Sequence, residues 1–450
     1  MMNPYLQDIR KIFNISLPMV VSQITRLLNG FIATIMIARL GTVHLAAMAL
    51  GQTYYLVFFL FFMGLFFSTS ILTGHHFAAK HKEDIEKTIA HAIIMSIVFA
   101  VPVMLLMRLG SYLFLLFGQK PAVVHIAQQY IDALSWGVLP IFISINLQQF
   151  LIGVSRPKIL NLFSGLGLLI NLVLFNLFIF GNFGFPALGV AGAGYSISLA
   201  ATIVMFVNIL YIKKSKGLKQ YQLFAGIKDF SMERLMTAVN IGWPIGLTMV
   251  LEMIAGMIFV LFIGIISTEA LAAYQVVWQL SLIALMIPVA CSQAIAVVTS
   301  QHLGANEQHF IRRSTLITWG LCLSLVMLFS LTFWIAPHAV VGLFLNREHH
   351  ASALTFHIAM RMLMITGFIQ LFDSTRFILN GCLRGLRDVR APMFISITGF
   401  WIIGIPLAAI VVFVLKLGVI TLWWSTLVGL LMIVYLLLKR VLDKTRAFQQ

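Results

Sequence analysis

The sequence predicts an all-α polytopic membrane protein in which twelve transmembrane helices form two pseudo-symmetric six-helix lobes. Of its 450 residues, 60% are hydrophobic and 10% are charged, whereas soluble domains are about 45–50% apolar and about a quarter charged. Many apolar runs reach about 20 residues, the length that crosses a bilayer. The second half of the chain also repeats the first.

Short charged segments separate the apolar runs and set the expected helix boundaries. No charged n-region, short apolar core and small-residue cleavage site open the chain, so we expect no removable signal peptide. We expect a multi-pass protein of the cell (inner or plasma) membrane. The twelve expected spans are 12–36, 46–72, 88–108, 123–150, 159–181, 189–212, 238–266, 271–299, 314–335, 352–380, 391–414 and 418–438.

The formal net charge of +16 is distributed as in a membrane protein. If loops are assigned alternately from the inside, the inner loops hold 22 Lys and Arg residues and the outer loops hold five. This asymmetry places both termini in the cytoplasm and adds attraction to anionic lipid. It therefore argues against nucleic acid as a partner.

Several kinds of chemistry lack their sequence signature. The three cysteines have no paired spacing that would indicate a disulfide framework or a metal site. No GxxxxGK[ST] loop is present to cradle the phosphates of ATP. The chain is therefore not expected to be an enzyme or to hold a resident cofactor.

The internal repeat is read from polar and small residues that recur at one offset. Asn14-Ile-Ser-Leu-Pro18 aligns with Asn240-Ile-Gly-Trp-Pro244, which is 226 residues further on, and Gly30 aligns with Gly256 in the same register. Six helices per repeat give both halves the same orientation. An axis along the membrane normal is therefore expected to relate them.

The repeat predicts three segments: an N-terminal lobe over 1–212, a cytoplasmic linker over 213–236 and a C-terminal lobe over 237–450. Transporters built from paired repeats hold the substrate at the repeat interface and move one repeat against the other. The architecture therefore favours a secondary transporter.

Two acidic residues lie well inside predicted spans, Glu252 and Asp373. A charge at the bilayer centre costs about 2.5–3.5 kcal/mol on insertion scales, so such residues usually face a cavity or a partner and mark ion paths. Both belong to the second half, which predicts one acidic pocket there. The structural alternatives are a salt bridge from Asp373 to Arg376, which lies on a neighbouring part of the same helix face, and a protonated Glu252 that packs between helices.

Arg26 occupies the position that the repeat pairs with Glu252, because the two numbers differ by 226. The two residues meet across the interface, or each lines a cavity of its own lobe; we favour the second arrangement. Among the polar residues within spans, the best further candidates for the substrate cavity are Gln275, Trp278 and Gln279, because aromatic and amide groups offer stacking and adaptable hydrogen bonds.

Several segments resemble the MATE (multidrug and toxic compound extrusion) family, from about residue 10 to 440. The first helices of the two repeats, NISLPMVVSQ and NIGWPIGLTMVLE, carry the resemblance. So do FGFPALGVAGAGYS at 183–196, LAAYQVVWQLSLIALMIPVACSQAIAVVTSQHLGAN at 271–306 and QLFDSTRFILNGCLRGLRD at 370–388. Within the family the chain is most similar to the NorM branch.

The resemblance implies a V-shaped pair of lobes that exports organic, often cationic, compounds against inward Na+ or H+. It also implies that Glu252 and Asp373 bind the coupling ion and contact the substrate, with Na+ as their metal if sodium drives export. The chain departs from the family pattern at three positions. Ala33 replaces an aspartate that many relatives carry, Arg376 replaces an uncharged residue, and Ile369 replaces an aromatic hydroxyl.

The leading hypothesis is therefore a multidrug antiporter that works by alternating access as a functional monomer in the lipid bilayer. Its partners would be small organic cations or drugs, with Gln275, Trp278, Gln279 and Arg26 adding substrate contacts and Arg376 acting as a gate or charge partner. A flippase for lipid-linked sugars shares the two-lobe plan and is the alternative. An intramembrane aspartyl protease is more remote, because the GxGD stretch typical of such enzymes is absent.

Overall fold

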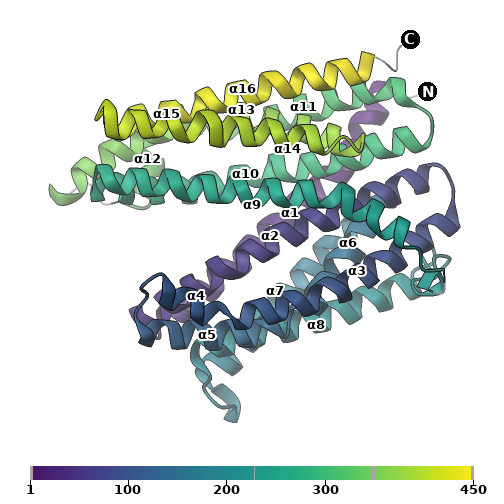
Figure 1. Ribbon diagram of the computed structural model, residues 1–450, viewed down its shortest axis with the longest axis horizontal. Coiled ribbons are helices and arrows are strands. Elements are labelled where there is room, and N and C mark those ends of the chain that lie inside the picture. Colours follow the sequence, from purple (N-terminus) through teal and green to yellow (C-terminus); the bar gives the residue numbers. More distant parts are fainter. Residues whose placement is uncertain (1–3, 228, 346–349, 447–450) are drawn as a thin grey trace. The chain divides into compact units, whose positions relative to one another are not determined.

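The computed structural model describes residues 4–227, 229–345 and 350–446, and in these ranges the secondary structure is entirely helical. Eleven of the described helices are long and apolar enough to cross a membrane. The pair α5 (Pro121–Ser135) and α6 (Val138–Gly153) adds a twelfth span, bent by 50°. The predicted class and all twelve predicted spans are confirmed (Figure 1).

The helices of the two repeats follow one another along the chain. The first repeat contains α1 (Pro4–Ala38), α2 (Thr42–Ala78), α3 (Lys82–Arg108), α4 (Gly110–Leu116), α5, α6, α7 (Lys158–Phe180) and α8 (Gly189–Lys214). The second contains α9 (Met232–Ile266), α10 (Thr268–Gly304), α11 (Ile311–Ile335), α12 (Pro337–Gly342), α13 (His350–Gly385), α14 (Arg390–Ile397), α15 (Ile405–Ala409) and α16 (Val419–Arg446).

Contacts divide the chain into two compact units at positions that match the repeat. One unit is the segment 21–246, and the other combines the chain up to residue 20 with the segment from 247 onward. The two boundaries, 20 and 246, are 226 residues apart, which is the repeat offset. The start of α1 thus groups with the second repeat and the start of α9 with the first. The lobes predicted at 1–212 and 237–450 stay a prediction drawn from the repeat.

Helix crossings at equivalent positions explain this grouping. In α9, a Cβ added to Gly242 would overlap the carbonyl oxygen of Leu65 in α2. The repeat equivalents of these two residues are Ser16 in α1 and Cys291 in α10, and their side chains are joined by a hydrogen bond. Each repeat therefore starts with a helix that needs a small residue where it meets the other repeat's second helix.

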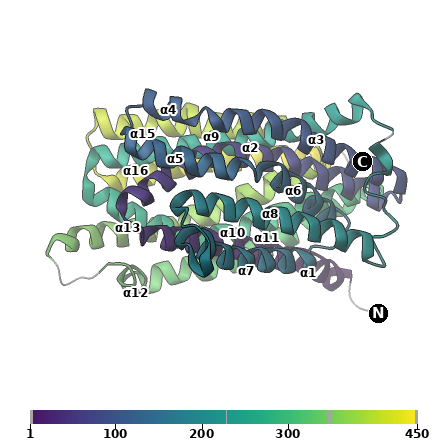
Figure 2. The same ribbon diagram turned by 90° about the horizontal axis from the view of Figure 1, so that it is seen from below.

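Within the unit 21–246, α2 packs against α3, α5 and α6, and α8 packs against α5, α6 and α7 (Figure 2). A buried polar network joins three of these helices. Asn146 of α6 accepts a hydrogen bond from Thr69 of α2 (2.6 Å) and donates one to Ser96 of α3 (2.8 Å). Such hydrogen bonds between membrane helices stabilise their packing.

In the second unit, α13 is the helix against which α10, α11 and α16 pack. Its close approach to α10 depends on Gly381 and Gly385, because a Cβ at either would overlap the backbone carbonyl of Ser292 or Ala296. This packing extends the helix to Gly385, five residues beyond the predicted span end. Arg384, which the sequence placed in an inner loop, therefore lies in the helix.

Prolines change the helix geometry at two of the expected places. The α5–α6 break comes before Pro140, whose ring clashes in a regular helix with the carbonyl four residues earlier, at Trp136. Between α14 and α15, residues Thr398–Gly404 form a π-helix (η4) just before Pro406, and Ile410–Val414 form a second one (η5). Such π-helical turns are frequent at functional sites.

Substitution of Gly242 by alanine tests the crossing of α9 over α2. Because the new methyl group would overlap the Leu65 carbonyl oxygen, we expect Gly242→Ala to reduce stability by about 1–3 kcal/mol, measured as a lower melting temperature in detergent. The matched control is Gly256→Ala in the same helix, where nothing lies within 4 Å of the added atom. Equal melting temperatures for the two variants would contradict the crossing.

Candidate functional site

The two membrane acids of the second unit share one arginine. Arg376 of α13 places its Nη1 atom 2.5 Å from Oε1 of Glu252 in α9. Its Nε atom lies 2.7 Å from Oδ1 of Asp373, one turn earlier on α13. The predicted acidic pair is thus brought together by the residue that departs from the family pattern.

Aromatic groups fix the position of the guanidinium. The Arg376 Cζ atom lies 4.6 Å from the ring centre of Phe377 and 5.4 Å from that of Phe400, distances at which a cation is attracted to an aromatic ring. Phe400 and its neighbour Trp401 belong to η4. Trp401 donates a hydrogen bond (3.2 Å) from its indole to the carbonyl of Leu251, next to Glu252. The π-helix therefore contacts both the cation and the helix that carries one acid.

Burial differs between the members of this Glu252–Arg376–Asp373 triad. The Arg376 side chain is 6% exposed, whereas those of Glu252 and Asp373 are 22% and 21% exposed. The carboxylates therefore remain accessible while the cation is buried. Two carboxylates and one guanidinium leave the triad with one negative charge when both acids are ionised.

Arg384 is the charged residue near the triad that sequence reasoning missed as part of the site. It lies close enough to interact electrostatically with Glu252 and Arg376, although no ion pair between it and either residue is found among the described contacts. It follows Arg376 by eight residues, a little over two helical turns. The signal that could have found it was this spacing, combined with Gly381 and Gly385 as sites of close helix packing.

The aromatic and amide candidates of α10 occupy a different place from the one the sequence suggested. Trp278 stacks on Tyr274 (6.1 Å between ring centres), and Tyr274 meets Trp423 of α16 edge-on (5.7 Å). Gln275 is exposed, and the Oε1 atom of Gln279 is buried without a partner. Among the described contacts, none joins these three candidates to Glu252 or Asp373.

Nearer to the acids, Gln370 lies one turn before Asp373. Its Oε1 atom is buried without a hydrogen-bond partner, and its Nε2 atom donates weakly (3.5 Å) to the Ser281 carbonyl. A buried acceptor without a donor is costly. Together with the free oxygens of the two acids, it is a candidate oxygen ligand for a hard cation.

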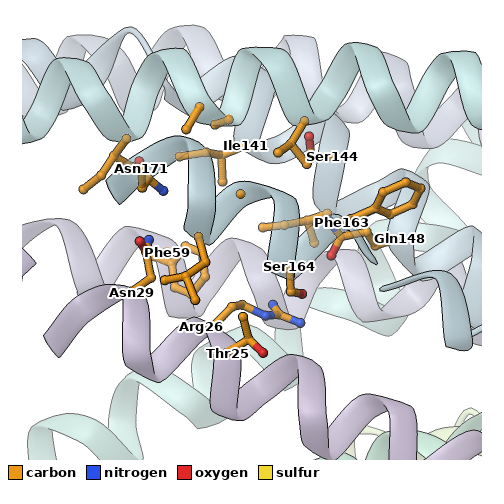
Figure 3. A pocket seen from close by; sticks show the side chains of 17 residues that line it. Thr25, Arg26, Asn29, Phe59, Ile141, Ser144, Gln148, Phe163, Ser164 and Asn171 are labelled. Atoms are coloured by element: carbon orange, nitrogen blue, oxygen red, sulfur yellow. The ribbon is translucent and has the colours of Figure 1, made fainter. Parts of the chain in front are cut away.

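Arg26 lies in the other unit, in a pocket formed within 21–246 (Figure 3). This pocket draws its residues from α1, α2, α6, α7 and α8. Ala33, at the position where many relatives carry an acid, is buried and is not among the residues that line it. Ile369 packs against the apolar cluster of Ile365, Leu427 and Leu430.

Removal of the shared cation should show how much the triad depends on it. Arg376→Gln leaves two partly buried carboxylates without their partner, and loss of one member of such a pair costs about 3–5 kcal/mol. We expect a lower melting temperature at neutral pH, restored by the additional changes Glu252→Gln and Asp373→Asn. The control is Arg440→Gln, which removes an exposed pair with Asp388 (2.8 Å) and should cost at most about 1 kcal/mol. Equal losses in the two single variants would contradict the triad's role.

Comparison with known proteins agrees with this arrangement. The chain is 28% identical to a probable multidrug resistance protein NorM of Mesorhizobium japonicum, over 99% of this chain and 96% of that protein. It is 29% identical to another of Pseudomonas aeruginosa, over 96% of this chain and 88% of that protein.

Solved structures share the fold. A multidrug resistance MATE family transporter of the MOP superfamily in an outward-facing conformation has a TM-score of 0.87 at 19% identity, over 100% of this chain and 99% of its own. A MOP superfamily transporter from Pyrococcus furiosus has a TM-score of 0.88 at 19% identity, over the whole of both chains.

The MatE family model matches residues 18–178 and again 244–410, so it is found once in each repeat. The two matches begin 226 residues apart, at the repeat offset. Together they cover most of the chain, and the chain therefore belongs to the MatE family of membrane transporters, which are not enzymes.

Proposed function

We propose that this protein exports organic compounds by antiport against an inward cation, and that the Glu252–Arg376–Asp373 triad is the site where the cation and the compound compete. The observation that carries the proposal is the ion pairing of two accessible carboxylates with one buried arginine inside membrane helices. The names of the relatives, multidrug resistance proteins, support drug export.

The charge of the triad supplies the coupling. An uncompensated charge within a membrane is costly, so the triad is stabilised when one monovalent cation joins it. A positively charged group on the exported compound satisfies the same need. Because two cations at one site repel each other, each displaces the other, and the site remains neutral in both states. Arg376 stays in place as a fixed counter-charge.

Protons and sodium ions would use this site differently. Protonation of one carboxylate would weaken its ion pair with Arg376 and free that side chain to move. Sodium would need several oxygen ligands, which the free oxygens of the acids and the unpartnered Gln370 carbonyl supply. The transport assay below separates the two ions.

The expected topology follows from the loop charges. We propose a location in the plasma membrane with both termini in the cytoplasm, because the loops assigned to that side carry most of the Lys and Arg residues. The triad is built from one chain. This supports a functional monomer.

Gradient-driven transport tests the proposal. Purified protein in liposomes should export ethidium when either a proton or a sodium gradient is imposed, and the effective gradient identifies the ion. We expect Glu252→Gln and Asp373→Asn each to reduce the driven rate by about tenfold or more, since coupling of this kind amounts to 5–150-fold.

The matched control is Asp388→Asn, which removes an acid that pairs with Arg440 outside the triad; it should leave the rate unchanged. Driven ethidium export that persists undiminished in both triad variants would exclude these acids as the coupling site. Movement of a lipid-linked sugar without ethidium export would favour the flippase.

A further inference from the structure

The pocket of the unit 21–246 is separate in its chemistry from the acidic triad. It has a volume of about 180 Å³ and is lined by Arg26, Asn29, Ser144, Gln148 and Asn171 among mainly apolar side chains (Figure 3). An apolar cavity of about 150 Å³ accepts benzene. The pocket therefore has room for one aromatic ring with a small polar group.

Arg26 gives this pocket a positive charge that nothing in it balances. The lining residues include no Asp or Glu, and among the described residues the Arg26 guanidinium has no ion pair or hydrogen bond. Its side chain is exposed where it lines the pocket. A guanidinium presents a planar fork of donors that matches a carboxylate. The pocket thus favours an anionic group.

Three further polar atoms in the pocket lack partners. They are Oδ1 of Asn29, Oδ1 of Asn171 and Oγ of Ser144, and the residues Asn171 and Ser144 are each only 6% exposed. A buried amide oxygen that lacks a donor is costly. A ligand that fills the pocket must therefore bring N–H or O–H donors as well as its anionic group.

We propose that this pocket binds the carboxylate of the exported compound, and that the exported compounds include aromatic carboxylates that also carry amino groups. The carboxylate pairs with Arg26, the ring fills the apolar part of the pocket, and the N–H groups reach Asn29 and Asn171. This inference rests on the proposed export function for the meaning of the pocket, and it names the class of substrate.

Equilibrium binding of two matched dyes tests the assignment without requiring transport. The first dye is a diamino rhodamine with a free carboxyphenyl group, and the second is its methyl ester, which keeps the amino groups and loses the anion. Fluorescence polarisation with the purified full chain in a neutral detergent gives each affinity. We expect the acid to bind about tenfold or more tightly than the ester, the range that a charged hydrogen bond supplies.

Variants locate the preference. Arg26→Gln should abolish the preference for the acid while the ester binds as before, and Arg26→Lys should restore part of it because the charge returns. Arg39→Gln removes an exposed arginine just after α1 and outside the pocket, so it should change neither affinity. Equal affinities of the wild type for the two dyes, or equal losses for both dyes in Arg26→Gln, would overturn the proposal.

A lipid phosphate is the other source of an oxyanion near a membrane. Adding phosphatidylglycerol to the detergent should leave the affinity for the acid dye unchanged if the pocket holds the exported compound. Displacement of the dye by this lipid in the wild type would overturn the assignment. Failure of the export function would appear as absent ethidium transport with the dye preference intact, so the two failures are distinguishable.

Discussion

The ion pairs of Arg376 with Glu252 and Asp373 are the interaction on which the rest of the account depends. A buried cation and two accessible acids cannot be placed in a membrane bundle without each other, because each unpaired charge is costly there. The surrounding structure serves this arrangement. The π-helix η4 places Phe400 against the guanidinium, and glycines at the α10–α13 contact let α13 continue past Gly381 so that Arg384 adds to the local charge.

Gene duplication gave the two repeats opposite charges at one helical position, Arg26 and Glu252. In the second unit, the acid is balanced by an arginine of the same unit. In the first unit, the arginine has no balancing acid among the residues that line its pocket. A compound with both a cationic and a carboxylate group therefore suits this pair of environments better than a simple cation does.

Much of the fold could be predicted from the sequence, because hydrophobic length, loop charge and the 226-residue repeat are one-dimensional signals. The acids Glu252 and Asp373 were found for the same reason, since charge within an apolar run is visible without a structure. The contact between Arg376 and both acids was not, because it depends on the rotation of α9 against α13. The placements of Phe400 and Arg384 depend on a π-helix and on a helix extension that local patterns do not encode.

The affinity for ethidium as a function of sodium concentration and pH tests the central claim most directly. If one cation is displaced from the triad per ethidium bound, the logarithm of the dissociation constant should rise with the logarithm of one of these cation concentrations with a slope of about one. The slope should vanish in the Glu252→Gln, Asp373→Asn double variant. Saturable binding in the wild type that depends on neither cation would contradict the account.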